Sequence, residues 1–273
     1  MCKIQLGGVK LILKSLASTW RLNINRRVKE ALRESDVVVC ATTEYAQLVE
    51  IAIGKNHHSH LCYLPENCID KLYELNNKKF DGEKINLIYI GRLDEGKAPF
   101  IILEALAQVG DKNLFHLDMV GGGPLLSRSK DYVKANDLMG IVEFHGRLER
   151  LQVIKMLEDA HLMVLPSLYD ANTTVIWEAM SHSVPTLCLD HCGMHDTVKE
   201  GTGIKIPVTT YADIVNKITK VLQGIAERPE CLKTMAEYLL EHRKEYTWER
   251  RLERFEEFYT LAEQQFSKRK KAK

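Results

Sequence analysis

Short apolar runs alternate with longer amphipathic runs along most of the chain from residue 85 onward. Short apolar runs are typical of buried parallel strands, and a repeat of apolar positions every three to four residues is typical of helices. Strands are predicted at residues 85–90, 114–120, 142–145, 162–166 and 186–189. Helices are predicted at residues 99–108, 125–136, 151–158, 174–181 and 211–226. The alternation indicates an α/β fold with a doubly wound parallel sheet, whose ligand lies at the carboxyl ends of the strands.

The amino-terminal part of the chain shows the same alternation in a shorter form. A strand is predicted at residues 36–43, a helix at 44–54 and a second strand at 60–65, and the polar run at 66–84 is typical of a linker. Since a full α/β domain has on the order of 100 residues or more, we expect an incomplete second Rossmann-like domain here. The basic run at residues 268–273 is expected to be a frayed end.

The composition is that of a folded protein with reduced cysteines and no general affinity for nucleic acid. The 273 residues are 45% hydrophobic and 27% charged, which is typical of a folded chain. The 38 Lys and Arg residues nearly balance the 37 Asp and Glu residues, so the net charge of +1 gives no reason to expect a nucleic-acid partner. The seven cysteines are odd in number and accompany no secretory signal, which favours reduced thiols and a cytoplasmic location.

An apolar stretch at residues 4–17 is interrupted by Lys10 and Lys14. It is shorter than the roughly 20 uninterrupted apolar residues that a membrane span needs. A basic group follows it, consisting of Arg21, Arg26, Arg27 and Lys29. This pattern allows peripheral contact with the inner membrane surface, although a basic helix face is more often simply solvated.

Two cations follow the predicted strand at residues 85–90. Arg92 and Lys97 lie just beyond Gly91, where a doubly wound sheet binds its ligand. An Arg can bind two phosphate oxygens at once and a Lys supplies a mobile point charge, so this turn suits a diphosphate. A solvated charged loop is the alternative. The next strand also ends in a glycine turn, Gly121-Gly122-Gly123-Pro124, where backbone can approach a ligand closely, although any strand-to-helix turn uses these residues.

Two carboxylates, Asp170 and Glu178, stand eight positions apart around the start of the predicted helix at 174–181. Asn172 and Thr173 are suitable N-caps, and the free amides at a helix N-terminus can bind an anion. One face of this segment can therefore bind sugar and ribose hydroxyls. The alternative is that Asp170 is itself a helix cap and Glu178 an exposed helix residue.

Together, these segments resemble the family 4, or group 1, retaining glycosyltransferases of the GT-B fold. The resemblance covers residues 37–259, including Tyr246-Thr247-Trp248, which is similar to the start of the family's closing helix. The segments that match in order and spacing are Gly91-Arg92-Leu93 with Lys97, Gly121-Gly122-Gly123-Pro124, Phe144-His145-Gly146, Pro166-Ser167, Asp170 with Glu178-Ala179-Met180, and Val184-Pro185.

The resemblance implies transfer of a sugar from a nucleoside-diphosphate sugar to a glycan or lipid-linked acceptor with retained anomeric configuration, as in polysaccharide biosynthesis. Residues 1–80 would then be an acceptor-side remnant and linker, residues 81–245 the donor-binding domain, and residues 246–273 the crossover helix and basic tail. Such a site is implied to need no metal or other cofactor, because fixed cations and helix amides stabilise the leaving diphosphate.

By the same resemblance, Asp170 faces the donor sugar, and Arg92 and Lys97 neutralise the diphosphate, which makes these three the implied catalytic residues. Asp170 stands where the family usually has Glu, and Asn172-Thr173-Thr174 replaces a turn that is commonly rich in glycine. Glu178 is implied to bind the ribose, and the turn after residue 145 to lie beside the base. The implied donor-binding residues are Gly91, Gly122, Gly123, Arg147, Leu148, Asn172, Thr173, Thr174, Val175 and Glu178.

Three alternatives stay open. The short first domain is compatible with a catalytically silent nucleotide-sugar-binding subunit that needs a partner chain carrying the acceptor domain. An epimerase of the same fold is another, although no epimerase-like acid–base set is present. Residues 188–196 contain Cys, His and Asp at spacings that zinc can use, yet no second cysteine pair supports a closed zinc site.

Overall fold

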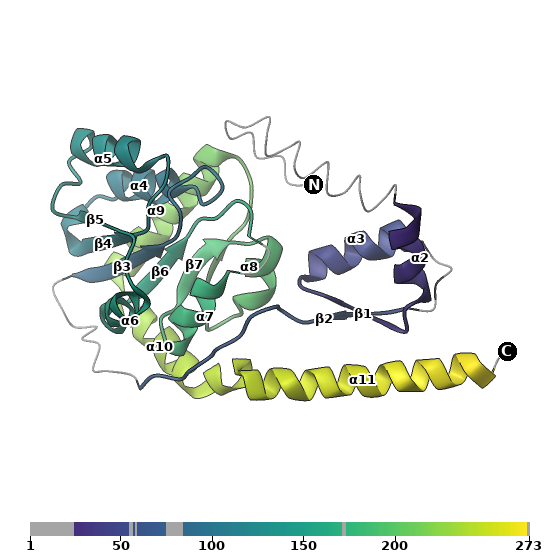
Figure 1. Ribbon diagram of the computed structural model, residues 1–273. Coiled ribbons are helices and arrows are strands. Elements are labelled where there is room, and N and C mark those ends of the chain that lie inside the picture. The colour runs from purple at the N-terminus through teal and green to yellow at the C-terminus, as the bar shows by residue number, and fades with distance from the viewer. Residues whose placement is uncertain (1–24, 55–56, 58, 75–83, 171–172, 272–273) are drawn as a thin grey trace. The chain divides into compact units, whose positions relative to one another are not determined.

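The structure is a computed structural model that describes residues 25–271 apart from 55–56, 58, 75–83 and 171–172 (Figure 1). The chain divides into two compact units. Among the described residues, the larger unit runs from Ile69 to Glu245, and the smaller unit joins residues 25–68 to residues 246–271. The apolar stretch at residues 4–17 with Arg21, on which membrane contact was predicted, lies outside the described residues, as does Asn172. No helix in the described ranges is long and apolar enough to cross a bilayer.

The larger unit is built on a six-stranded parallel sheet in the order β5-β4-β3-β6-β7-β8 (Figure 1). The strands are β3 (Ile85–Ile90), β4 (Phe115–Val120), β5 (Val142–Gly146), β6 (Leu162–Leu165), β7 (Thr186–Leu189) and β8 (Gly203–Ile206). Every residue of β6 and β7 is buried, as the continuous apolar runs predict for central strands. The doubly wound parallel sheet predicted from the sequence is confirmed.

Helices connect the strands and bury their apolar faces against the sheet. They are α4 (Pro99–Gln108), α5 (Leu126–Ala135), α6 (Arg150–Asp159), α7 (Thr174–Ser181), α8 (Cys192–Thr197), α9 (Tyr211–Glu227) and α10 (Glu230–His242), with short 3-10 turns η1 (Lys112–Leu114) and η2 (Arg243–Tyr246). Leu103 of α4, Leu117 of β4 and Ile214 of α9 are wholly buried in one apolar core. Each such side chain stabilises the fold by about 1.5–3 kcal/mol relative to an exposed position.

The direction in which successive strands are added reverses between β3 and β6. From β3 the chain adds β4 and then β5 on one side, after which it crosses back and adds β6, β7 and β8 on the other side. Leu87 of β3 pairs with Leu162 of β6, so the loops that follow these two strands leave neighbouring positions of the sheet. Open α/β sheets bind ligands in the crevice at such a reversal, outside the carboxyl ends of the strands.

The smaller unit contains a two-stranded parallel sheet of β1 (Val37–Cys40) and β2 (His60–Tyr63), with α2 (Arg26–Glu34), α3 (Thr43–Ile53) and α11 (Trp248–Lys271). The predicted strand at residues 36–43 is too long, because Thr42 ends it by capping α3 through a hydrogen bond from the Tyr45 amide to its hydroxyl oxygen at 3.0 Å. A small core of Cys40, Val49 and Ile53 lies between these elements.

The basic tail was expected to fray from residue 268 onward, but α11 continues through it as far as Lys271. Near the end of α11, the Arg269 guanidinium donates to the carbonyl of Glu34 at 2.8 Å and pairs with Asp36 at 3.2 Å. These contacts within the smaller unit hold the last turns of the helix and correct the expectation of a frayed end. Residues 272–273 lie outside the described part of the chain.

Candidate functional site

Lys97 and Asp170 meet at the reversal between β3 and β6. The Lys97 ammonium forms a salt bridge with Oδ2 of Asp170, which joins the loop after β3 to the loop after β6. Only 25% of the Lys97 side chain and 14% of the Asp170 side chain are exposed. The fold thus brings together two residues that the sequence pattern placed in separate loops. Because water screens a half-buried pair poorly, each charge strongly influences the other and any ligand beside it.

The loop that carries Asp170 is held by hydrogen bonds of both its backbone and its side chain. The Leu168 amide donates to the carbonyl of Gly96 at 2.8 Å, which ties the β6 loop to the β3 loop. The Ser167 hydroxyl lies 3.4 Å from Oδ2 of Asp170, and the Gly193 amide donates to the Asp170 carbonyl at 3.0 Å. These contacts orient Asp170 through the protein's own groups, which is the condition for electrostatic preorganisation. They also exclude Asp170 as the cap of α7, because Thr173 occupies the N-cap position.

Arg92 lies in the same loop as Lys97 but points to a different partner. Its Nε is 3.2 Å from Oδ2 of Asp94, and 65% of its side chain is exposed. The loop is supported by Tyr89, which is wholly buried and donates its hydroxyl to the carbonyl of Arg92 at 3.0 Å. Burial, together with the charges of Asp94 and Asp170, raises the pKa of Tyr89, so the hydroxyl keeps its proton and remains a donor.

The glycine turn after β4 packs against the loop after β3. A Cβ on Gly121, whose φ is +130°, would lie 1.9 Å from the carbonyl oxygen of Gly91, and one on Gly123 would lie 2.3 Å from the carbonyl oxygen of Leu93. A Cβ on Gly122 would meet nothing within 4 Å. Gly121 and Gly123 are therefore required for packing between loops, whereas the space beside Gly122 is open. The predicted contact of Gly91, Gly122 and Gly123 with a donor remains a prediction.

The turn after β5 joins the same edge of the sheet. The carbonyl of Gly146 accepts a hydrogen bond from the Gly121 amide at 2.6 Å, so the β5 turn is tied to the glycine turn. Arg147 is exposed beyond this contact and Leu148 is half-buried. Described residues of the predicted site thus come from the loops after β3, β4, β5 and β6, all at the carboxyl ends of parallel strands.

The start of α7 offers amide groups to the same region. Thr173 is the N-cap, as predicted, but its side chain makes no capping hydrogen bond. Thr174 and Val175 begin the helix, and its first turn contains no acidic residue. First-turn amides have no partner within their own helix, and together with the helix dipole they favour an anion at this end.

Glu178 lies farther along α7, with 32% of its side chain exposed. Its Oε1 is 4.0 Å from Nε of Arg150, the first residue of α6, and Arg150 also pairs with Asp70 at 3.3 Å. The sequence pattern did not single out Arg150, because an Arg at the start of a predicted helix resembles an ordinary surface residue. The carboxylate of Glu178 is exposed enough to accept hydrogen bonds from a ligand.

The segment at residues 188–196 does not gather the ligands of a zinc site. Cys188 is buried, and burial, opposed by the charge of Lys205, raises its pKa to about 12, so the thiol keeps its proton. Asp190 pairs with His195 at 2.7 Å and with Lys205 at 3.3 Å. Within the described ranges, the group of three ligand-type side chains that lie close together is elsewhere, on β4 and β5.

A family model described as "Glycosyl transferases group 1" matches residues 70–239. The matched range covers more than half of the chain and contains the four carboxyl-edge loops. The chain belongs to the group 1 glycosyl transferases. This confirms the family that the sequence pattern resembled.

Several relatives of this group 1 chain carry transferase names. Glycosyltransferase EpsF of Bacillus subtilis is 20% identical over 255 residues, which are 87% of this chain and 64% of the relative. An alpha-1,4-N-acetyl-D-galactosaminyltransferase of Campylobacter jejuni is 30% identical over 155 residues, which are 54% of this chain and 42% of the relative. The colanic acid biosynthesis glycosyltransferase WcaL of Salmonella typhimurium is 26% identical over 130 residues, which are 45% of this chain and 32% of the relative. The chain thus spans less than two thirds of the length of each.

Solved structures show the fold of the group 1 chain. The GtfA/B complex has a TM-score of 0.72 at 13% identity and covers 89% of this chain and 48% of that chain. Sucrose-phosphate synthase from Thermosynechococcus elongatus has a TM-score of 0.69 at 20% identity and covers 90% of this chain and 65% of that chain. At such identities the likeness shows the fold alone, which is the GT-B type expected from the sequence.

Proposed function

We propose that this chain binds a nucleoside-diphosphate sugar at the carboxyl edge of its six-stranded sheet and transfers the sugar, with retained anomeric configuration, to a glycan or lipid-linked acceptor. The observation that carries the proposal is the contact between Lys97 and Asp170 at the reversal between β3 and β6. It places a cation suited to phosphate beside a carboxylate suited to sugar hydroxyls in the crevice where such sheets bind ligands. Membership of the group 1 family supports glycosyl transfer as the reaction class.

The diphosphate is neutralised by three groups. The Lys97 ammonium has three donors, so it can keep its bond to Asp170 and also bind a phosphate oxygen. Arg92 can turn from Asp94 to the phosphate at little cost, because an exposed ion pair contributes only about 0–1 kcal/mol. The amides at the start of α7, from Thr173 onward, complete the anion site. In this proposal no metal ion is needed at the phosphates.

The nucleoside extends from the phosphates toward α7 and the β5 turn. The Glu178 carboxylate, oriented by Arg150, accepts hydrogen bonds from the ribose hydroxyls. The turn of Gly146, Arg147 and Leu148 lies beside the base, and the open space at Gly122 lets the donor approach the backbone. These assignments place the base on the β5 side of the sheet and the sugar at the β3–β6 reversal.

In the reaction, the bond between the anomeric carbon and the phosphate oxygen breaks, and its electron pair leaves with the diphosphate. The acceptor hydroxyl forms the new bond on the same face of the sugar and passes its proton to the departing phosphate oxygen. Lys97 and Arg92 lower the barrier because they stabilise the negative charge that develops on the leaving group. Asp170 contacts the sugar and holds Lys97 in position.

Calorimetric titration with UDP, GDP and ADP, with and without magnesium, tests the donor site. UDP comes first because a pneumococcal O-GlcNAc transferase of similar fold was solved in complex with UDP and GlcNAc. The double variant Arg92→Ala, Lys97→Ala should lose nucleotide binding. Lys112→Ala, which removes a lysine before β4 at the opposite end of the sheet, should retain it. A folded double variant with unchanged affinity would refute the assignment.

The role of Asp170 is tested by comparing UDP with the matching UDP-sugar. If Asp170 contacts the sugar, Asp170→Asn weakens binding of the UDP-sugar more than binding of UDP, and it lowers the rate of donor hydrolysis. If the carboxylate acts only through Lys97, Asp170→Asn weakens both ligands equally, and combining it with Lys97→Met adds nothing further. The second result would contradict the proposed sugar contact while leaving the phosphate site intact.

A further inference from the structure

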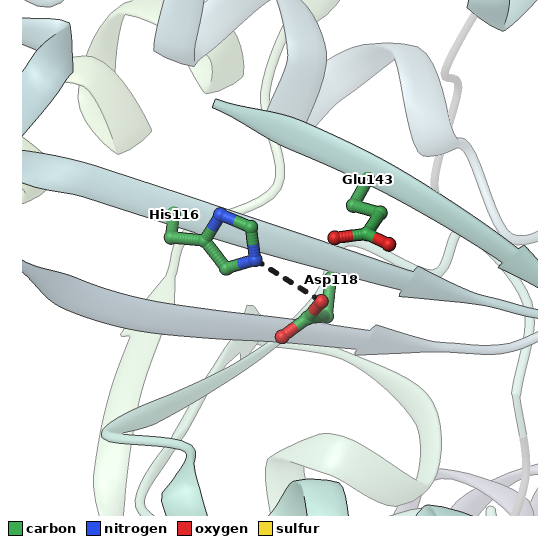
Figure 2. Close-up of side chains that lie close together, drawn as sticks. All are labelled: His116, Asp118 and Glu143. Carbon is green, nitrogen blue, oxygen red and sulfur yellow. Dashed lines mark hydrogen bonds and ion pairs between the residues drawn. The ribbon is translucent and has the colours of Figure 1, made fainter. Parts of the chain in front are cut away.

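A second group of polar side chains lies on one face of the sheet, where β4 meets the edge strand β5. His116 and Asp118 are two positions apart on β4 and so point to the same face, and Glu143 of β5 pairs with Asp118 in the strand register. One ligand atom from each of the three lies within 4.8 Å of the others. Figure 2 shows the imidazole and the two carboxylates facing one another.

His145 brings a second imidazole to the same place. Met119 pairs with Phe144, but Val120 pairs with Gly146, so His145 is an extra residue at a shift in register. Its Nε2 lies 2.6 Å from Oδ1 of Asp118, and Nε2 of His116 lies 3.2 Å from the same oxygen. Bulges of this kind redirect side chains and often lie beside functional sites. Two imidazoles from neighbouring strands therefore converge on one carboxylate oxygen.

We propose that His116, Asp118 and Glu143 bind one divalent transition-metal ion, with His145 donating to Asp118 and orienting it. Imidazole nitrogen combined with carboxylate oxygen suits ions such as Zn²⁺ and Co²⁺, whereas Mg²⁺ and Ca²⁺ prefer oxygen alone. A hydrogen bond from a further residue to a ligating carboxylate is the usual support of such sites. Nothing in the assignment of the sugar donor requires this ion.

The distances and burial fit this assignment. Ligand atoms lie about 2.0–2.2 Å from zinc, so two of them are about 4 Å apart at most. Rotation of the Glu143 side chain brings the three ligand atoms, which lie within 4.8 Å of one another, into that range, because 63% of this side chain is exposed and its contact with Nδ1 of His145 is long, at 3.8 Å. His116 and Asp118 are only 27% and 21% exposed and lie on a regular strand, so they form the fixed part of the site. The ion would then join β4 to β5 just before the Gly146 turn.

Titration of chelator-treated protein with Co²⁺ tests the proposal, because Co²⁺ bound to protein ligands gives visible absorption bands. We expect one Co²⁺ per chain, displaced by Zn²⁺, and a melting temperature that rises with Zn²⁺ concentration. His145→Ala keeps the three ligands but loses the orienting bond, and should weaken binding roughly 10–100-fold. His116→Ala and Glu143→Gln remove a ligand and should weaken it more.

The exposed position of Glu143 makes Glu143→Gln the decisive variant, since its folding should match that of the wild type. The matched control is His195→Ala, which removes an imidazole–carboxylate pair with Asp190 of similar length, 2.7 Å, outside the group. This control should bind Co²⁺ as the wild type does. The proposal is overturned if the wild type shows neither Co²⁺ bands nor Zn²⁺ stabilisation, or if Glu143→Gln binds Co²⁺ with undiminished affinity.

Discussion

Replacing Gly121 with Ala tests whether close backbone packing holds the carboxyl-edge loops together. The added Cβ would lie 1.9 Å from the carbonyl oxygen of Gly91 and 2.9 Å from its carbonyl carbon. Both are backbone atoms, so no side-chain rotation can relieve the contact. The φ of +130° at Gly121 is also one that residues with a Cβ rarely adopt. The loop after β4 must therefore move away from the loop after β3.

The loss of stability in Gly121→Ala is the sum of the backbone strain at residue 121 and of the separation of the two loops. A residue other than glycine in such a backbone conformation costs about 1–3 kcal/mol. Separation of the loops also strains the hydrogen bond from the Gly91 amide to the Val120 carbonyl, 2.9 Å long, and its loss costs about 0.5–1.5 kcal/mol. We expect the free energy of unfolding to fall by about 2–4 kcal/mol. In a unit of this size that corresponds to a drop in Tm of roughly 5–15 °C.

Urea unfolding followed by tryptophan fluorescence measures this loss. Trp177 is 4% exposed in the larger unit, so replacing Trp20 and Trp248 with Phe leaves it as the reporter of that unit. Gly122→Ala is the matched control from the same turn, because its Cβ meets nothing within 4 Å. Its stability should stay within about 0.5 kcal/mol of the parent. Equal stability of the Gly121→Ala and Gly122→Ala proteins would refute the packing argument.

Two further predictions concern single side chains. Tyr89→Phe leaves the carbonyl of Arg92 without its buried donor. The free energy of unfolding, measured in urea, should fall by about 1–3 kcal/mol, and the affinity for UDP should fall with it. If neither the stability nor the UDP affinity changed, Tyr89 would not support the loop. Burial opposes ionisation of Asp190, but hydrogen bonds from His195 and Lys205 outweigh it and lower the pKa. The stabilisation by the ionised Asp190 carboxylate is present above the pKa that this group has in the unfolded chain, and it is lost as pH falls through its lower pKa in the folded chain. Asp190→Asn should therefore be less stable than the wild type at pH 7, and the difference should vanish in acid. Urea midpoints across pH check this, and a difference independent of pH would contradict it.

The elements best predicted from sequence lie in the centre of the larger unit. β3, β7, α4 and α7 have the predicted bounds, because central parallel strands are mostly apolar and the helices over them bury most of their side chains. β8 was not predicted, because Gly203 and Lys205 interrupt its run of apolar residues. Gly203 is needed there, since a Cβ would lie 2.2 Å from the Thr186 carbonyl oxygen of β7, and Lys205 is tolerated because β8 is an edge strand.

The positions of the site residues could be predicted from the sequence, but their contacts with one another could not. Lys97 and Asp170 were recognisable because each follows a buried strand, and parallel strands end at one edge of the sheet. Their direct contact depends on β3 lying next to β6, and strand order is not encoded in any local pattern. The supporting residues gave no signal of their own, because Tyr89 is indistinguishable in sequence from a core aromatic residue.

The two groups of polar residues occupy positions that suit opposite charges. At the carboxyl edge the strands have ended, and in the proposed donor site the amides at the start of α7 bind an anion together with Lys97 and Arg92. On the face of the sheet, backbone groups are engaged in the β-ladder, and only side chains alternating along β4 and β5 are available. Those side chains, His116, Asp118 and Glu143, provide lone pairs and negative charge, which bind a cation. In the two proposals the same parallel sheet supports an anion site where its strands end and a cation site where they continue, and the two sites adjoin where β4 runs into the glycine turn after Val120 and β5 into the Gly146 turn.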